Sequence, residues 1–242
     1  MKLSPAAGTY AVTAVCGMLD AACFLKLGQV FVEIVTGNVA LLAFALGTQG
    51  VSAFAPRGAV PPYVVALGCF AVGAVLGGRM VQLGEAGRKM GFTADAALIG
   101  AAAVTAGLTH PGPQGHARYA VFGVLAVAMG IQNAIMRRWG TKDLATNLMT
   151  LTLTGLLADS WLAGGSSPNA ARRGVSIAVF TASAAAGAAL GRYGVLWPVL
   201  AAFIVFAAAL PVLLRSPVSP PAPVGSSARS ASRWLPPQRR PC

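Results

Sequence analysis

The sequence predicts an all-α integral membrane protein. Of its 242 residues, 56% are hydrophobic and only 10% are charged, and the mean hydropathy is +0.69. Soluble domains carry about 25% charged residues, so this composition excludes an ordinary soluble fold. Several apolar runs approach or exceed the length of about 18 residues that is typical of a membrane helix. We therefore expect the lipid bilayer to surround the chain.

Eight apolar segments precede residue 215, four in each half of the chain. They cover residues 8–27, 31–48, 63–83, 93–109, 118–137, 144–163, 174–192 and 194–214. If all eight cross the membrane, the 18 Lys and Arg residues divide almost evenly between the two sides. If 31–48 and 144–163 enter and leave on the same side, fourteen basic residues lie together, as expected for cytoplasmic loops.

The charge distribution therefore predicts about six transmembrane helices plus two re-entrant or broken polar segments. Both termini are then cytoplasmic. Residues 1–214 form a polytopic membrane domain, and residues 215–242 form a disordered, basic, Pro-rich cytoplasmic tail with seven Pro and five Arg. The net charge of +12 arises from these topology signals, so we expect no nucleic-acid partner.

A faint internal repeat relates the two halves, at about 8–109 and 118–214. Equivalent residues recur 113 or 114 positions apart: Gly17 with Gly130, Asp20 with Asn133, Glu33 with Asn147, Thr36 with Thr150, Gly73 with Gly187, and Gly77 with Gly191. Because each half crosses the membrane three times, the halves are inverted relative to each other. Transporters often retain such weak internal symmetry.

Two acidic residues, Asp20 and Glu33, lie inside apolar runs, whereas the other four are placed at loops or segment ends. An acid at the bilayer centre costs about 2.5–3.5 kcal/mol and is often functional. These two acids form either a proton or cation site, or a packing network satisfied by Lys26, Asn38 or a nearby hydroxyl group.

Other polar residues in the apolar segments extend this candidate site. The substrate-binding or ion-binding candidates are Asp20, Glu33, Thr36, Gly37, Asn38, Gln132, Asn133, Asn147 and Thr150. The alternative for the carboxamides and hydroxyls is hydrogen bonding between helices. We expect Thr36, Gly37 and Asn38 to break a half-helix near mid-membrane, facing Asp20 and the two carboxamides at 132 and 133.

The pairs Gly73 with Gly77 and Gly187 with Gly191 allow close helix packing. The sequence contains no motif typical of hydrolases, zinc proteases or P-loop proteins, and its four Cys residues lack metal-ligand spacing. We therefore expect neither an enzyme, nor a metal site, nor a cofactor.

The stretches GMLDAACFLKLGQVFVEIVTGN and MGIQNAIMRRWGTKDLATNLMTLTLTG resemble those of the YoaK-like multi-pass bacterial membrane proteins, a widespread domain of unknown function. The similarity covers about residues 10–214. It implies a bacterial inner-membrane protein of about six spans without an assigned activity. Glu33 departs from the family, in which this position is usually polar but uncharged, and Leu151 stands where the family often has Gly.

These features favour a small-solute transporter or permease, coupled to protons or to another cation. The alternative is a non-transporting membrane scaffold or regulatory protein whose polar residues only hold helices together. A polar cavity shared by Asp20 and the Thr36–Asn38 turn favours transport, and a dry, fully paired core favours the scaffold. The solute, the coupling ion and assembly into a homo-oligomer are left open.

Overall fold

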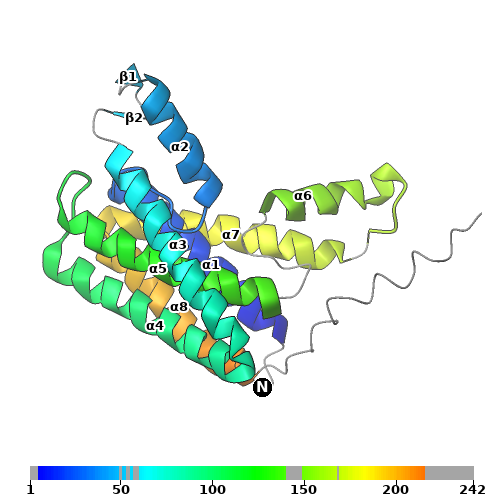
Figure 1. Ribbon diagram of the computed structural model, residues 1–242. Helices are drawn as coiled ribbons and strands as arrows, with labels where there is room; N and C mark the ends of the chain where they lie inside the picture. The colour runs from blue at the N-terminus through cyan, green and yellow to red at the C-terminus, as the bar shows by residue number, and fades with distance from the viewer. Residues whose placement is uncertain are drawn as a thin grey trace, which may run out of the picture.

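A computed structural model describes residues 5–48, 51–52, 55–56, 60–139, 149–167 and 169–215. The described helices are α1 (Pro5–Lys26), α2 (Val35–Thr48), α3 (Val60–Gln82), α4 (Gly84–Thr109), α5 (Ala117–Trp139), α6 (Met149–Ala158), α7 (Ala170–Leu190) and α8 (Leu196–Arg215). Two short 3-10 helices, η1 (Trp161–Ala163) and η2 (Gly191–Tyr193), follow α6 and α7. A minimal antiparallel pair, β1 (Val51–Ser52) with β2 (Ala55–Pro56), follows α2 (Figure 1).

Six of these helices are long and apolar enough to cross a membrane, namely α1, α3, α4, α5, α7 and α8. They pack into one bundle, which is seen obliquely in Figure 1. Large apolar side chains such as Val72, Val75 and Ile204 remain exposed on its surface, as expected where lipid covers a protein. The predicted all-helical fold with about six membrane helices is confirmed.

The other two helices, α2 and α6, are short. Their 14 and 10 residues correspond to lengths of about 21 and 15 Å, less than the hydrocarbon core of about 30 Å. Helix α2 packs against α3 and projects from the bundle, and α6 lies along α7 (Figure 1). They belong to the two segments that the charge distribution predicts not to cross. The candidate Asn147 and the tail from residue 216 onward lie outside the described residues.

The helix pairings repeat when the chain is divided between α4 and α5. Helix α3 packs against α5 as α7 packs against α1, and α4 packs against α5 as α8 packs against α1. The short helices follow the same rule, since α2 contacts α3 and α6 contacts α7. Two structurally related halves that exchange partners would produce this pattern, so it supports the predicted repeat.

Glycines at the equivalent crossings correct the register of that repeat. A Cβ atom added to Gly77 would lie 2.8 Å from the Ile131 carbonyl oxygen, and one added to Gly187 would lie 2.7 Å from that of Met18. Ile131 and Met18 are themselves 113 positions apart, so Gly77 corresponds to Gly187.

The predicted pairing of Gly73 with Gly187, and of Gly77 with Gly191, is therefore wrong by one helical turn. Gly73 lies against the backbone of Val127 at the α3–α5 crossing. Gly191 follows the last residue of α7, and a Cβ atom there would meet only the Lys26 side chain, at 3.6 Å. The sequence alignment was shifted because small residues recur at every turn of α7.

Helices α3 and α4 are separated by Leu83 alone. Gly84, with φ of +68°, reverses the chain there, a conformation that is accessible to glycine at little cost. The loop expected between 83 and 93 is therefore absent, because residues 84–92 are the first turns of α4. Arg88 is buried in these turns and donates hydrogen bonds to the carbonyl oxygens of Leu213 and Leu214, which satisfies the end of α8.

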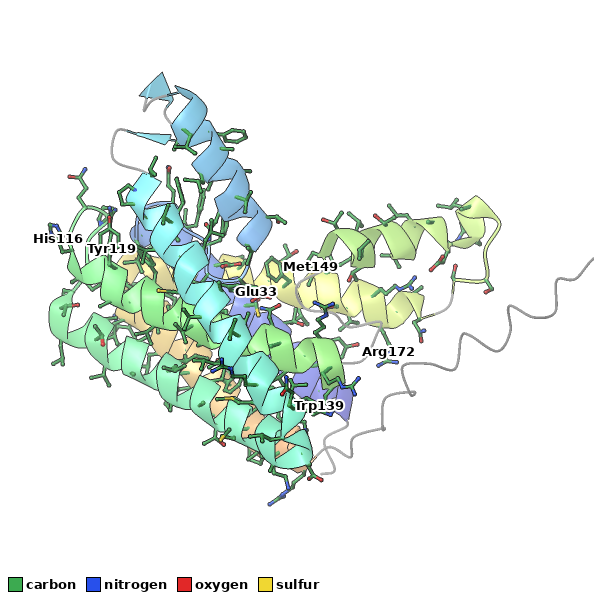
Figure 2. All side chains as sticks on the ribbon, in the orientation of Figure 1. Glu33, His116, Tyr119, Trp139, Met149 and Arg172 are labelled. Carbon is green, nitrogen blue, oxygen red and sulfur yellow. The ribbon has the colours of Figure 1, made fainter. Side chains whose placement is uncertain are left out.

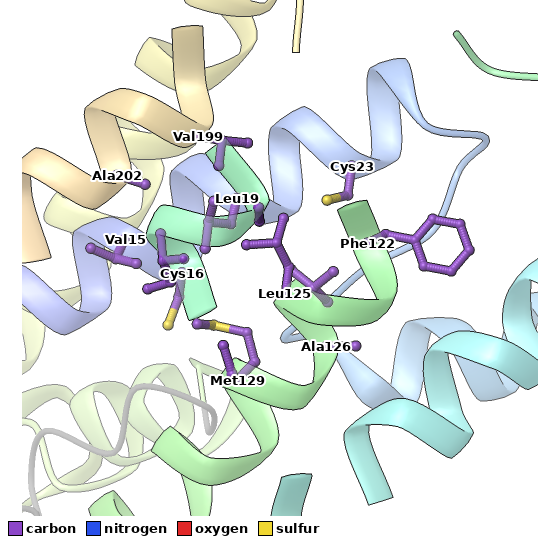
Figure 3. Packing of buried hydrophobic residues seen from close by; sticks show 14 of the residues in the cluster. Val15, Cys16, Leu19, Cys23, Phe122, Leu125, Ala126, Met129, Val199 and Ala202 are labelled. Carbon is purple, nitrogen blue, oxygen red and sulfur yellow. The ribbon is translucent and has the colours of Figure 1, made fainter. Parts of the chain in front are cut away.

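The apolar core lies where α1, α5 and α8 meet. Val15 and Leu19 of α1, Leu125 and Met129 of α5, and Val199 of α8 are all fully buried (Figure 3). Cys16 points into the same core (Figure 3) and is a free thiol. The polar residues described next lie on the same two central helices, α1 and α5.

Candidate functional site

The candidate site begins where α1 ends. Gly28 and Gln29 adopt positive φ angles of +99° and +61°, and the Gln29 N–H donates to the Phe24 carbonyl oxygen at 3.1 Å. This is the usual glycine-terminated helix end. The seven residues from Gly28 to Ile34 then form no helix, although Val30 and Val32 are fully or almost fully buried.

This buried non-helical segment turns back into the bundle. At its start, a Cβ atom added to Gly28 would meet the Arg118 side chain and the Pro113 carbonyl oxygen, so Gly28 lies beside the loop that precedes α5. Four to six residues later, the backbone reaches Asp20 on α1, which is about 9 Å from the end of that helix at 1.5 Å per residue. Helix α2 then leaves the bundle again (Figure 1). Residues 28–48 therefore have the geometry of a re-entrant segment.

Asp20 holds the deepest part of this segment. Its Oδ1 accepts hydrogen bonds from the N–H groups of Val32 and Glu33, both at 2.8 Å, and its Oδ2 accepts one from Ile34 at 3.2 Å. The side chain is only 3% exposed. Asp20 thus satisfies backbone donors that precede α2 and that have no water to bind in a membrane interior. The carboxylate is engaged in a structural contact.

Asn38 and Gly37 secure the same segment from the other side. The Asn38 side chain accepts a hydrogen bond from the Phe31 N–H at 2.9 Å and donates one to the Phe31 carbonyl at 2.6 Å. A Cβ atom at Gly37 would lie 2.8 Å from the Phe31 ring, which stacks on Phe24 with ring centroids 4.6 Å apart.

The break was predicted at Thr36, Gly37 and Asn38, and this position is wrong. Helix α2 begins at Val35, so these three residues are helical and follow the break. Gly37 is needed for its small size, because the Phe31 ring occupies the space of a side chain. Thr36 is exposed and takes no part in the buried contacts.

Glu33 joins the re-entrant segment to α5. Its Oε2 accepts a hydrogen bond from Asn133 Nδ2 at 2.6 Å, and the same Nδ2 donates to the Met129 carbonyl at 2.9 Å. Glu33 is 4% exposed and lies near the middle of the bundle (Figure 2). Its other oxygen, Oε1, is buried without a hydrogen-bond partner. The carboxyl group is therefore only half satisfied.

Gln132 lies beside Asn133 and faces α1. Its Nε2 contacts the Cys16 sulfur at 3.2 Å, while its Oε1 is buried without a partner. Asp20, Glu33, Gln132 and Asn133, all of which were candidates from the sequence, are therefore brought together at the α1–α5 contact and the re-entrant segment.

Asp95 is the polar residue that sequence analysis missed. It was assigned to a loop edge, but it lies in α4, eleven residues after the helix begins and fourteen before it ends. Its side chain is fully buried, and neither carboxyl oxygen has a hydrogen-bond partner. Asp95 is close enough to Glu33 for the two carboxyl groups to repel each other when both are charged. The available signal was the apolar sequence that continues on both sides of Asp95.

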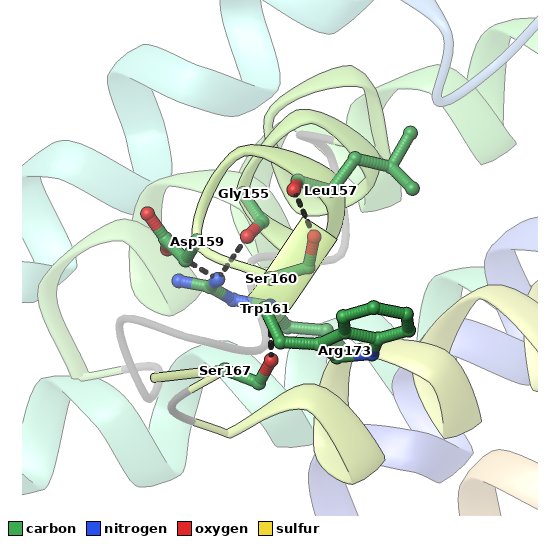
Figure 4. Close-up of polar contacts among 7 residues, drawn as sticks. All are labelled: Gly155, Leu157, Asp159, Ser160, Trp161, Ser167 and Arg173. Atoms are coloured by element: carbon green, nitrogen blue, oxygen red, sulfur yellow. Dashed lines mark hydrogen bonds and ion pairs between the residues drawn. The ribbon is translucent and has the colours of Figure 1, made fainter. Parts of the chain in front are cut away.

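The polar residues of α6 lie outside this cluster. Thr150 is exposed. Asp159, at the end of α6, binds Arg173 of α7, whose Nη1 also donates to the Gly155 carbonyl, with both distances at 2.6 Å (Figure 4). This contact fixes α6 against α7 and closes the last turn of α6.

A surface pocket of about 150 Å³ lies elsewhere, between the end of α4 and the start of α8. His110, Tyr193 and Trp197 are among its lining residues, and none of the buried carboxyl groups contributes to it. Within the described part of the chain, no three His, Cys, Asp or Glu residues are grouped so that they could hold a metal ion.

A bundle of six apolar helices with a re-entrant segment and buried polar side chains defines a multi-pass membrane protein. The chain belongs to the family described as protein of unknown function (DUF1275), which matches residues 9–214. This agrees with the resemblance drawn from the two sequence signatures. Neither the curated proteins nor the solved structures contain a match to the chain.

Proposed function

We propose that the protein is a small-solute transporter of the bacterial inner membrane, with both termini in the cytoplasm. The observation that carries this proposal is the re-entrant segment, whose non-helical backbone reaches Asp20 inside the bundle. Irregular backbone at membrane depth is tolerated where it is buried in protein or lines a cavity. Transporters use such interrupted segments, placed between two related halves, to bind a solute near mid-membrane.

The two short helices supply the elements that such a transporter would move. Helices α2 and α6 each pack mainly against one long helix, α3 or α7, and have exposed apolar faces. Helices α3 and α7 in turn contact α5 and α1 at close, glycine-lined crossings. Rocking of one half against the other at these crossings would open the central polar cluster to either side in turn.

The scaffold remains the second candidate, and specific contacts favour it. The carboxylate of Asp20 accepts hydrogen bonds from three backbone N–H groups. The carboxamide of Asn38 forms two hydrogen bonds with the backbone of Phe31. A scaffold would need these contacts and would have no need for the unpartnered oxygens of Glu33 and Asp95. Those oxygens, together with the re-entrant segment, favour transport over the scaffold.

Solute-evoked currents in proteoliposomes on a solid-supported membrane test the proposal. The panel comprises neutral, cationic and anionic amino acids, sugars and small organic acids. We expect at least one class to evoke a transient current in the wild type and none in Glu33→Gln. Glu85→Gln, at an exposed carboxylate paired with Lys89, is the matched control and should retain the current. A panel without any current, together with a thiol at Cys16 that no aqueous reagent reaches, would establish the scaffold.

A further inference from the structure

Two buried carboxyl groups from distant parts of the chain lie within electrostatic range of each other inside the bundle. Glu33 belongs to the re-entrant segment and Asp95 to α4, and they are 4% and 0% exposed. Asp95 lies about 16 Å from the start of α4 and about 21 Å from its end, at 1.5 Å per residue, and is therefore near mid-membrane. The labelled position of Glu33 near the middle of the bundle agrees with this depth (Figure 2).

Most carboxyl oxygens of the pair have no donor within the described residues. Three of its four carboxyl oxygens, both from Asp95 and Oε1 from Glu33, have no hydrogen-bond partner, and neither has Gln132 Oε1. Asn133 Nδ2 supplies the hydrogen bond to the fourth oxygen, Glu33 Oε2. A buried acceptor without a donor costs free energy, so this arrangement needs an added hydrogen.

No basic side chain neutralises the pair within the described part of the chain. The nearest arginine along α4, Arg88, donates to carbonyl oxygens at the end of α8. Among the described residues, neither Glu33 nor Asp95 forms an ion pair. The other titratable groups in electrostatic range are Asp20 and Cys16 of α1. Asp20 is held by three backbone N–H groups, and the Cys16 thiol is approached by the Gln132 amide.

We propose that Glu33 and Asp95 together hold one exchangeable proton inside the bundle. The proton turns one of the unpartnered carboxyl oxygens into a hydroxyl group and leaves one negative charge in place of two. Two like charges within electrostatic range of each other in a low-dielectric interior are unfavourable. The role of this proton as the coupling ion for a solute rests on the proposed transport function. The binding of the proton does not depend on that function.

A sodium ion fits the cluster less well. Hard cations require several oxygen ligands around one point. Here a thiol and an amide nitrogen occupy the α1 side of the cluster, and the acidic residues are not grouped as metal ligands within the described residues. Sodium is therefore the competing outcome that the experiment must distinguish.

Infrared difference spectroscopy of the full-length protein in lipid vesicles tests the proposal directly. The C=O stretch of a protonated carboxylic acid is separate from the bands of carboxylates and amides and shifts in heavy water. We expect one such band at neutral pH that disappears as the pH is raised. In Glu33→Gln and in Asp95→Asn the remaining buried carboxyl group should keep a band of altered frequency, and the double variant should lose it. Glu85→Gln, at an exposed carboxylate paired with Lys89, should leave the band unchanged.

Three results would overturn the proposal. A wild type without a pH-dependent carboxylic acid band would contradict it, whether or not the variants fold. A band that persists in the double variant would assign the proton to another residue, such as Asp20. Loss of the band on addition of sodium chloride, but not of choline chloride, would replace the proton by a sodium ion. Solute currents are not used, so failure of transport leaves the outcome of this experiment unaffected.

Discussion

At the scale of single residues, the structure changes the role of Asp20. The sequence made it a candidate for a proton or cation site. In the structure its two oxygens accept three backbone hydrogen bonds, whereas an asparagine side chain has one oxygen and places an amide donor at the other position. The substitution therefore places the amide donor of asparagine opposite at least one buried backbone N–H group, which is also a donor.

We predict that Asp20→Asn lowers the stability of the protein by about 1–3 kcal/mol, the cost of an unsatisfied buried hydrogen-bonding group. Thermal unfolding of the purified protein in detergent measures the change. Asp159→Asn is the control, because its ion pair with Arg173 is partly exposed and should contribute no more than about 1 kcal/mol. Equal melting temperatures for Asp20→Asn and the wild type would show that Asp20 does not hold the re-entrant segment.

Most of the polar cluster could be predicted from single residues, because polar groups inside apolar runs are conspicuous. Asp20, Glu33, Gln132 and Asn133 were recognised in this way. Asp95 was missed because the helix that contains it begins at Gly84, nine residues before the apolar segment that was used to place it. Which of these groups would be paired depended on long-range contacts, and these cannot be deduced from the sequence.

At the scale of helices, glycine allows the close crossings that join the two halves. Gly77 and Gly78 are neighbours on α3 and provide a matched comparison. A Cβ atom at Gly77 would lie 2.8 Å from the Ile131 carbonyl oxygen and 2.8 Å from the Ala134 side chain, whereas one at Gly78 would have no neighbour within 4 Å.

We predict that Gly77→Ala destabilises the protein by about 1–3 kcal/mol, because the crossing must separate to admit the methyl group. Gly78→Ala should be neutral or should stabilise it by about 0.5–1 kcal/mol, since alanine favours the helix. Thermal unfolding of the two variants under the same conditions measures the difference. If the two variants unfold at the same temperature, α3 and α5 do not pack as described.

The helices themselves were largely predictable, and their ends were less so. Apolar runs located all six long helices, but the start of α4 was placed nine residues too late because charged residues occupy its first turns. The helix break was placed at Gly37 instead of Gly28. The residues around Gly28 and Gly37 do not show which of the two glycines ends a helix. Only the backbone conformation shows that Gly28 has the positive φ angle.

At the scale of the whole molecule, the proposed topology places the two ends of α4 on opposite sides of the membrane. Position 88 is unsuitable as a labelling site because Arg88 is buried. Lys89 and Gln114 are exposed and lie at the start of α4 and in the loop after it.

We predict that a cysteine at position 114 reacts with an impermeant thiol reagent added outside intact cells. A cysteine at position 89 should react only after the membrane is opened. A variant of the protein that lacks the native cysteines provides the background for both. Reaction from outside at position 89 alone would show that the orientation is opposite to the proposed one. Reaction from outside at both positions would exclude a membrane-crossing α4.

The central claim is that the buried cluster opens to both sides of the membrane, and Cys16 tests it most directly. This thiol is fully buried, contacts Gln132, and lies in electrostatic range of Glu33 and Asp95. The measurement is the rate of modification of Cys16, with the other three cysteines replaced by serine, by an impermeant methanethiosulfonate in right-side-out and in inside-out vesicles. Alternating exposure predicts slow but complete modification from each side. A thiol that stays unmodified from either side until the protein unfolds would contradict transport and identify the cluster as a permanently closed core.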